Sequence, residues 1–221
     1  MQQTDAAVAQ VPDLIMPERT SGYTKGHDTR EMILRTALAI LIDEGWHAMS
    51  MRRVAAACAI KLGNLTYHYP TREDLVRALL DAVTAAYEHE FDAFLRQEGL
   101  TPAQRLERYC TLVLDDIPAL KTTRLFPELW ALSNHDAFVH DRMHELYARA
   151  RAPLNDIIAD MRPDLARGIC ETLALFISFA MEGSTVFAGH GKPFTGQMGM
   201  IKQIALRGFA DLVRDYRPAA C

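Results

Sequence analysis

Four side chains in and beside the stretch Gly63–Leu75, GNLTYHYPTREDL, could contact nucleic acid. Asn64 can pair bidentately with adenine, and Lys61 can reach guanine or a phosphate. Tyr67 and His68 suit phosphate oxygens, which position a protein on a duplex without specifying its sequence. These residues fall in what reads as a helix of one or two turns. A short helix that exposes an amide, a phenol and an imidazole together is typical of a surface that reads DNA.

A second set of side chains could bind a metal ion. His140 and His144 lie four residues apart in HDRMHE, so they share one face of a helix, a spacing found in zinc sites. The second residue is Asp141, where a metalloprotease helix has glutamate, and no third ligand is fixed by the sequence. A solvated or packed face is therefore favoured, and we expect no metal site, no cofactor and no catalytic residue. A small helical enzyme or metal-binding protein that uses this face is the alternative.

The segment GHGKP, Gly189–Pro193, suggests a phosphate-binding loop. A P-loop needs glycine at the position of Val186 and Ser or Thr at that of Pro193. The segment is better explained as a glycine that ends a helix, followed by a proline that prevents its continuation.

Apolar residues recur at steps of three and four residues, which predicts helices, and no segment shows the alternation of a strand. Gly45 ends the first helix, Ser50 is the N-cap of the second, and Thr71 caps a long fourth helix after a short third helix near 62–68. We expect an all-α fold of about nine helices, in which a three-helix DNA-binding domain precedes a larger helical ligand-binding and dimerisation domain. The later helices are expected near 102–117, 122–133, 136–161, 163–189 and 194–216.

Three short helices, the last two joined by a tight turn, form a helix-turn-helix, whose second helix enters the major groove. We expect this DNA-binding domain over 25–75, after a disordered leader over 1–24 and before the ligand-binding and dimerisation domain over 76–221. The residues expected at DNA are Lys25, His27, Arg30, Ser50, Met51, Arg52, Lys61, Leu62, Gly63, Asn64, Thr66, Tyr67, His68 and Arg72.

The segment TREMILRTALAILIDEGWHAMSMRRVAAACAIKLGNLTYHYPTREDLVRALL resembles the DNA-binding domain of the tetracycline-repressor (TetR) family of transcriptional regulators. The resemblance rests on an ordered set: the spacing from Gly45 to Ser50, the Gly-Asn-Leu and Tyr-His-Tyr triplets, and the run that starts at Thr71. It implies an all-helical dimer that binds DNA and releases it when a small molecule enters the C-terminal domain. Three positions depart from the family pattern: Ala59 replaces a glycine, Lys61 a capping serine and Thr66 an aromatic residue.

The two C-terminal helices are apolar on nearly every side, which predicts burial on every side. They suggest a symmetric four-helix contact between two subunits, and the resemblance implies the same two helices. A monomer with a thick core is the alternative. The residues expected at the contact are Ile177, Met181, Ser184, Met198, Ile201, Ala205, Phe209 and Leu212.

Aromatic residues of the middle helices suggest an apolar cavity for a hydrophobic or aromatic effector, although each could also be plain core. In the expected mechanism, the effector tilts the helix that starts at Thr71 and changes the separation of the two recognition helices. The residues expected at the effector are Phe94, Tyr109, Phe126, Trp130, Asn134, His135, Phe138, Tyr147 and Phe179.

Composition fits an ordinary globular chain: 221 residues, 49% hydrophobic, with a net charge of −4. The four cysteines lie far apart without a CxxC pair, which argues against a disulfide framework or a zinc site. The first residues lack the features of a signal peptide. The most apolar stretch, residues 172–188, is too short for a membrane span. We therefore expect a cytoplasmic, ligand-responsive regulator of transcription, most often a homodimeric repressor that binds an operator and no membrane. A dimer that has lost DNA binding is a further alternative, which Ala59 and Thr66 favour.

Overall fold

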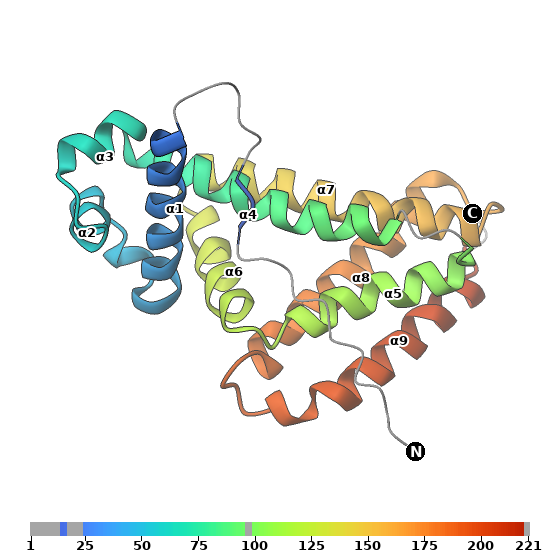
Figure 1. Ribbon diagram of the computed structural model, residues 1–221. Coiled ribbons are helices and arrows are strands. Elements are labelled where there is room, and N and C mark those ends of the chain that lie inside the picture. The colour runs from blue at the N-terminus through green and yellow to red at the C-terminus, as the bar shows by residue number, and fades with distance from the viewer. Residues whose placement is uncertain (1–13, 17–23, 96–98, 219–221) are drawn as a thin grey trace, which may run out of the picture. The chain divides into compact units, whose positions relative to one another are not determined.

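The computed structural model describes residues 14–16, 24–95 and 99–218, except for a few side chains at helix ends. Within these ranges every regular element is helical, and there are nine α-helices, two short 3-10 turns and no strand (Figure 1). The prediction of an all-α fold is confirmed. The elements are α1 (Thr24–Glu44), η1 (Trp46–Ala48), α2 (Met51–Ala57), α3 (Leu62–His68), α4 (Arg72–Leu95), α5 (Pro102–Asp116), α6 (Leu120–Ser133), α7 (Ala137–Met161), α8 (Arg167–Ala188), η2 (Thr195–Gln197) and α9 (Met198–Asp215).

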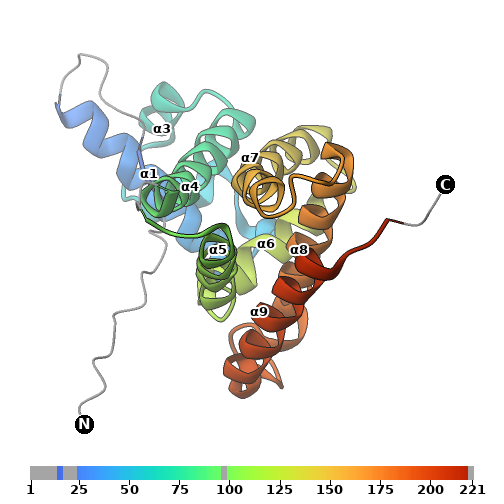
Figure 2. The ribbon, with the colours of Figure 1, turned by 90° about the vertical axis from the view of Figure 1, so that its right-hand side faces the viewer.

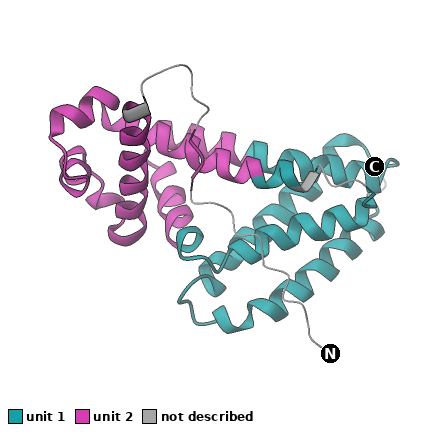
Figure 3. Cartoon of the chain, in the orientation of Figure 1, with its two compact units in different colours: residues 1–11, 90–123, 148–221 teal, residues 12–89, 124–147 magenta. Residues whose placement is uncertain are grey.

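The described chain divides into two compact units (Figure 3). The N-terminal unit comprises residues 14–16, 24–89 and 124–147, and the C-terminal unit comprises residues 90–95, 99–123 and 148–218. The boundaries fall inside α4, α6 and α7. The DNA-binding domain expected over 25–75 lies within the N-terminal unit, together with part of α6 and α7.

Local signals in the sequence set the helix starts. Ser50 Oγ accepts a hydrogen bond from the backbone N–H of Arg53 at 3.2 Å, which caps α2. Thr71 and Asp74 bond reciprocally at the start of α4, with distances of 3.0 and 3.1 Å between backbone nitrogen and side-chain oxygen. Lys61, at the start of α3, makes no side-chain cap bond. The caps expected at positions 50 and 71 are confirmed.

A single hydrophobic cluster forms the core of the N-terminal unit. It joins the three helices expected at DNA to α4 and to the parts of α6 and α7 in this unit. Leu14 also belongs to it, with 4% of its surface exposed, and the neighbouring Ile15 donates its backbone N–H to the carbonyl of Ala82 at 2.9 Å. Both residues fall in the segment 1–24 that was expected to be a disordered leader, so that expectation is wrong for them. Fully buried members of the cluster include Ile33, Leu41, Val54, Leu65, Leu75, Leu79, Leu125 and Leu129.

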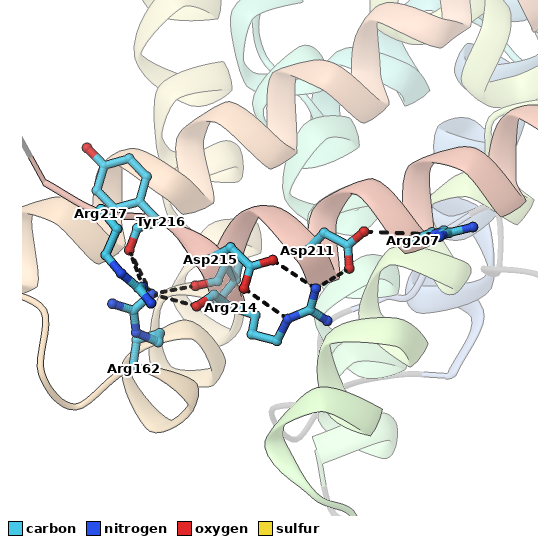
Figure 4. Close-up of polar contacts among 8 residues, drawn as sticks. Arg162, Arg207, Asp211, Arg214, Asp215, Tyr216 and Arg217 are labelled. Atoms are coloured by element: carbon cyan, nitrogen blue, oxygen red, sulfur yellow. Dashed lines mark hydrogen bonds and ion pairs between the residues drawn. The ribbon is translucent and has the colours of Figure 1, made fainter.

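In the C-terminal unit, α9 packs along α5 and α8 (Figure 2). Arg162, just after α7, fixes the end of α9: its Nη1 donates to the carbonyl oxygens of Val213, Arg214 and Tyr216, at 2.8, 3.1 and 3.1 Å (Figure 4). The carbonyls in the last turn of a helix lack N–H partners within the helix, so Arg162 supplies the missing donors at the end of α9. The same guanidinium binds the carboxylate of Asp164 and lowers its pKa to about 2.

The α8 helix is long and apolar enough to cross a membrane by length and composition, with a mean hydropathy of 1.3 over an 18-residue window. The buried part of this helix packs within the C-terminal unit, and core helices of soluble proteins have the same composition. This feature is therefore weak support for a membrane span.

Candidate nucleic-acid interface

The turn between α2 and α3 has the tight geometry of a helix-turn-helix. The backbone N–H of Ile60 bonds back to the carbonyl of Ala55 at 3.0 Å, and Ala59 between them has φ 52°. This left-handed conformation costs a residue with a Cβ about 1–2 kcal/mol. The turn redirects the chain within a few residues, so α3 follows closely after α2 and Val54 and Leu65 share one core.

The α3 helix has a buried side and an exposed side. Leu65 and the following Tyr69 are buried, whereas Lys61 and Asn64 are exposed and 82% of Tyr67 is exposed. Leu62 and Gly63 are also exposed, and the hydroxyl of Thr66 donates to the carbonyl of Gly63 at 3.2 Å. The helix therefore offers one amide, one ammonium group and one phenol to a partner on its outer side.

His68 ends α3 beside this surface. Its ring meets that of Tyr67 edge to face, with 5.2 Å between ring centroids. Partial burial, and then the nearby positive charge of Arg30, lower the pKa of His68 below its ordinary value. The neutral imidazole is therefore favoured in the free protein at neutral pH, and a nearby phosphate would favour the protonated form.

The residues expected to flank α3 lie at the starts of α1 and α2. Ser50 and Arg52 are exposed, and Met51 is half-buried. The guanidinium of Arg30 lies 5.2 Å from the centroid of the Tyr69 ring, and His27 is half-buried with a buried Nδ1 that has no protein partner. The side chain of Lys25, also expected here, lies outside the described part of the chain.

Arg72, expected at a DNA phosphate, makes contacts inside the protein. Its Nε donates to the carbonyl of Met49 at 3.0 Å, and its guanidinium lies 4.3 Å from the centroid of a ring of Trp46. It therefore links the start of α4 to the η1 turn. The sequence carried no signal of this role, because an Arg in a first helical turn suits a phosphate equally well.

Three of the residues expected at an effector come together in the N-terminal unit. Trp130 Nε1 donates to the hydroxyl of Tyr147 at 2.8 Å, and the rings of Tyr147 and Phe126 are 6.4 Å apart. Phe126 also meets Tyr87 edge to face at 5.7 Å. Phe126 itself is buried, whereas Trp130 and Tyr147 are half-buried.

The other residues expected at an effector are dispersed. Asn134 and His135 are exposed. The guanidinium of Arg77 lies 4.5 Å from the centroid of the Phe138 ring. Phe138 also lines an open hollow of about 820 Å³. Tyr109 and Phe179 belong to the C-terminal unit, and the side chain of Phe94 lies outside the described part. Burial raises the pKa of the Tyr109 phenol, whose hydroxyl donates to the carbonyl of Ala150 at 2.7 Å.

Half of the eight residues expected at a subunit contact are buried in the C-terminal unit. Ile177 and Met181 are buried within the chain, as are Met198 and Phe209. Ser184, Ile201, Ala205 and Leu212 are half-buried, and Leu212 lines an apolar groove of about 270 Å³ with Phe176 and Tyr216. The exposed apolar side chains of the same two helices are Leu175, Phe176, Phe179, Val186, Phe187, Met200 and Ile204.

The rings of His140 and His144 lie 4.3 Å apart between centroids, on the exposed side of α7. Among the residues that the structure describes, no group of three or more His, Cys, Asp or Glu side chains could hold a metal ion. The pair lies on the wall of the open hollow beside Phe138.

Comparison with known proteins identifies the helix-turn-helix region. A family model described as bacterial regulatory proteins, tetR family, matches residues 33–79. The HTH-type transcriptional regulator UidR of Escherichia coli (strain K12) is 35% identical over 57 residues, which are 26% of this chain and 29% of UidR. The chain thus matches less than a third of the length of that relative.

Two longer similarities extend beyond this region. An uncharacterized HTH-type transcriptional regulator in the dhlA 5′ region of Xanthobacter autotrophicus is 26% identical over 166 residues, covering 72% of this chain and 78% of that protein. The solved structure of Salmonella enterica GusR has a TM-score of 0.70 and 20% identity, and the match covers 89% of this chain and all of that one. At this identity the structural likeness shows a shared fold.

Proposed function

We propose that this chain, a member of the tetR family of bacterial regulatory proteins, is a cytoplasmic DNA-binding transcriptional regulator. It acts as a homodimeric repressor that a small hydrophobic or aromatic effector releases from its operator. The observation that carries the proposal is the helix-turn-helix itself. Leu65 anchors α3 in the core, while Lys61, Asn64 and Tyr67 remain exposed on the outer side of that helix.

In the proposed complex, α3 lies in the major groove. Asn64 reads a base edge, and Tyr67 and Lys61 bind the backbone, so the first residue gives specificity and the others give affinity. Two copies read half-sites about 34–36 Å apart, one turn of the duplex. An effector that binds more tightly to a form with a different separation of the two α3 helices lowers the fraction of protein able to bind.

The exposed apolar side chains of α8 and α9 support dimerisation. Phe176 and Phe179 meet edge to face at 5.1 Å, and 66% of Ile204 is exposed. A surface of this kind is unfavourable in water and is typical of a subunit contact. The aromatic group around Phe126 and Tyr147 supports an apolar effector.

A selection of bound sequences from a random duplex library tests the proposal. The recovered duplex should contain two related half-sites, and its affinity should fall steeply with salt because binding releases counterions from the phosphates. Replacing Asn64 and Tyr67 together with alanine should weaken binding at least about a hundredfold, because each half-site loses one bidentate base contact and one phosphate contact.

The matched control is Asn134→Ala, which removes an exposed amide in the turn just after α6. It should leave the affinity unchanged. The proposal is wrong if the wild-type chain enriches no sequence at low salt, or if the double variant binds the selected duplex as well as the wild type.

A further inference from the structure

A side chain of α6 holds the turn that joins α1 to α2. Glu128 Oε2 accepts a hydrogen bond from the backbone N–H of Trp46 at 3.2 Å. Its Oε1 lies 3.4 Å from the place that a Cβ on Gly45 would occupy, and Gly45 has φ 81°, a conformation that glycine adopts without strain. The carboxylate therefore lies close against the backbone at the start of η1.

Arg124 holds the other side of the same turn. It precedes Glu128 by four residues, so the two side chains share one face of α6. Its Nη1 donates to the carbonyl of Ile42 at 3.2 Å and lies 3.4 Å from the Oδ1 of Asp43. The carbonyls in the last turn of α1 have no partner within the helix, and Arg124 supplies one of them with a donor.

Buried apolar contacts lie beside the polar contacts that Arg124 and Glu128 make with the turn between α1 and α2. Leu125 and Leu129 of α6 are fully buried in the same cluster as Leu41 of α1 and Met49, which follows η1. Residues 124–133 of α6 are thus part of the core that carries the helix-turn-helix.

The first turn of α6 is fixed in the C-terminal unit instead. Thr123 Oγ1 donates to the carbonyl of Ile117 at 3.1 Å and accepts the backbone N–H of His190 at 2.6 Å. The unit boundary follows Thr123. Pro127, four residues later, has no N–H to offer the Thr123 carbonyl, so the helical hydrogen-bond ladder is broken at this boundary.

We propose that Arg124 and Glu128 are positioning residues for DNA recognition. Through the α1–α2 turn they fix the pose of α2 and α3. The inference rests on the proposed function, because the pose matters only if α3 reads DNA.

The test compares Glu128→Ala and Arg124→Ala with Glu128→Gln, which keeps an acceptor oxygen, and with Asp141→Ala, an exposed carboxylate of α7 in the same unit. Hydrogen exchange of the Trp46 amide proton directly measures how well its hydrogen bond to Glu128 is maintained. Binding is measured on the selected duplex and on a duplex whose half-sites are one base pair further apart.

Glu128→Ala should speed exchange at Trp46 about tenfold and weaken binding to the selected duplex about tenfold, the effect of losing one charge-assisted hydrogen bond. A looser pose should also reduce the preference for the selected spacing over the longer one, which a mere loss of stability does not change. Arg124→Ala should weaken binding and spacing preference in the same direction. Glu128→Gln and Asp141→Ala should stay within about twofold of the wild type.

Two outcomes are distinct. If the wild type binds and both alanine variants keep its affinity and its spacing preference, the positioning role is overturned and the proposed function stands. If the wild type binds no duplex, the proposed function fails, and the inference that rests on it fails as well.

Discussion

Ala59 adopts a left-handed backbone conformation that is unfavourable for alanine. Its φ of 52° is strained for any residue with a Cβ, and glycine would relieve that strain. Part of the gain is offset because glycine has more freedom in the unfolded chain. We predict that Ala59→Gly raises the free energy of unfolding by about 0.5–1 kcal/mol, measured by urea denaturation. Ala57→Gly at the end of α2 is the matched control and should lower it; a gain there or a loss at position 59 would contradict the prediction.

We expect His68 to give DNA binding a dependence on pH. Its pKa in the folded protein lies below the ordinary value of 6.5, mainly because of burial and then because of Arg30. Phosphate oxygens would raise that pKa on binding, so the complex takes up a proton and affinity rises as pH falls through the pKa that His68 has in the complex. We predict that His68→Gln flattens this rise in salt-matched titrations between pH 7 and 5.

The stability of the free protein has the opposite sign. Because the unfolded chain binds the His68 proton first, the free energy of unfolding falls as pH drops below about 6.5, and His68→Gln removes that contribution. The exposed His47 of η1 is the control, and His47→Gln should keep the pH slope of DNA binding. Equal slopes for the wild type and His68→Gln would rule out this role.

At the scale of elements, the sequence predicted what periodicity and caps determine. The nine α-helices of the described residues follow from apolar spacing, and the caps at Ser50 and Thr71 fix two of their starts. The α8 helix begins at Arg167, four residues after the expected start, because residues 163–166 form a turn. When a helix is apolar on every side, the sequence does not show which of its faces is buried. It therefore could not predict that Ile177 is buried and Phe179 exposed.

The candidate DNA surface was predictable for a related reason. The motif places Asn64 and Tyr67 on the exposed side because Leu65 must be buried. Contacts between distant segments were not predictable, since no spacing encodes them. The contacts of Arg72 with Met49 and of Glu128 with Trp46 depend on how α4 and α6 pack in the N-terminal unit.

The segment Leu14–Met16 had no periodicity, yet it completes the core of the N-terminal unit. We predict that Leu14→Ala lowers the free energy of unfolding by about 2–3 kcal/mol, the cost of removing a buried leucine side chain. Ile15→Pro, which deletes the N–H that bonds to Ala82, should cost about 1 kcal/mol more than Ile15→Ala, which keeps it. Urea denaturation measures all three, and wild-type stability for Leu14→Ala would show that the segment does not contribute to the core.

For the whole molecule, the exposed apolar faces of α8 and α9 determine the expected assembly. Of the eight residues first expected at the subunit contact, four are buried in the chain and four are half-buried, whereas Phe179 and Ile204 expose 54% and 66% of their surface. A lysine at either position would bury an unpaired charge at a subunit contact, which is strongly unfavourable. We therefore predict that Phe179→Lys and Ile204→Lys convert a dimer to a monomer in analytical ultracentrifugation.

Loss of the dimer should also weaken DNA binding, because a monomer engages one half-site and gains nothing from the second. The affinity for the selected duplex should fall at least about a hundredfold, while binding to an isolated half-site stays unchanged. Leu120→Lys is the control, since it places the same charge on an exposed apolar side chain of the C-terminal unit outside α8 and α9. A dimer that survives both lysine substitutions at these two helices would place the subunit contact elsewhere, and the half-site spacing would then have to be set by another surface.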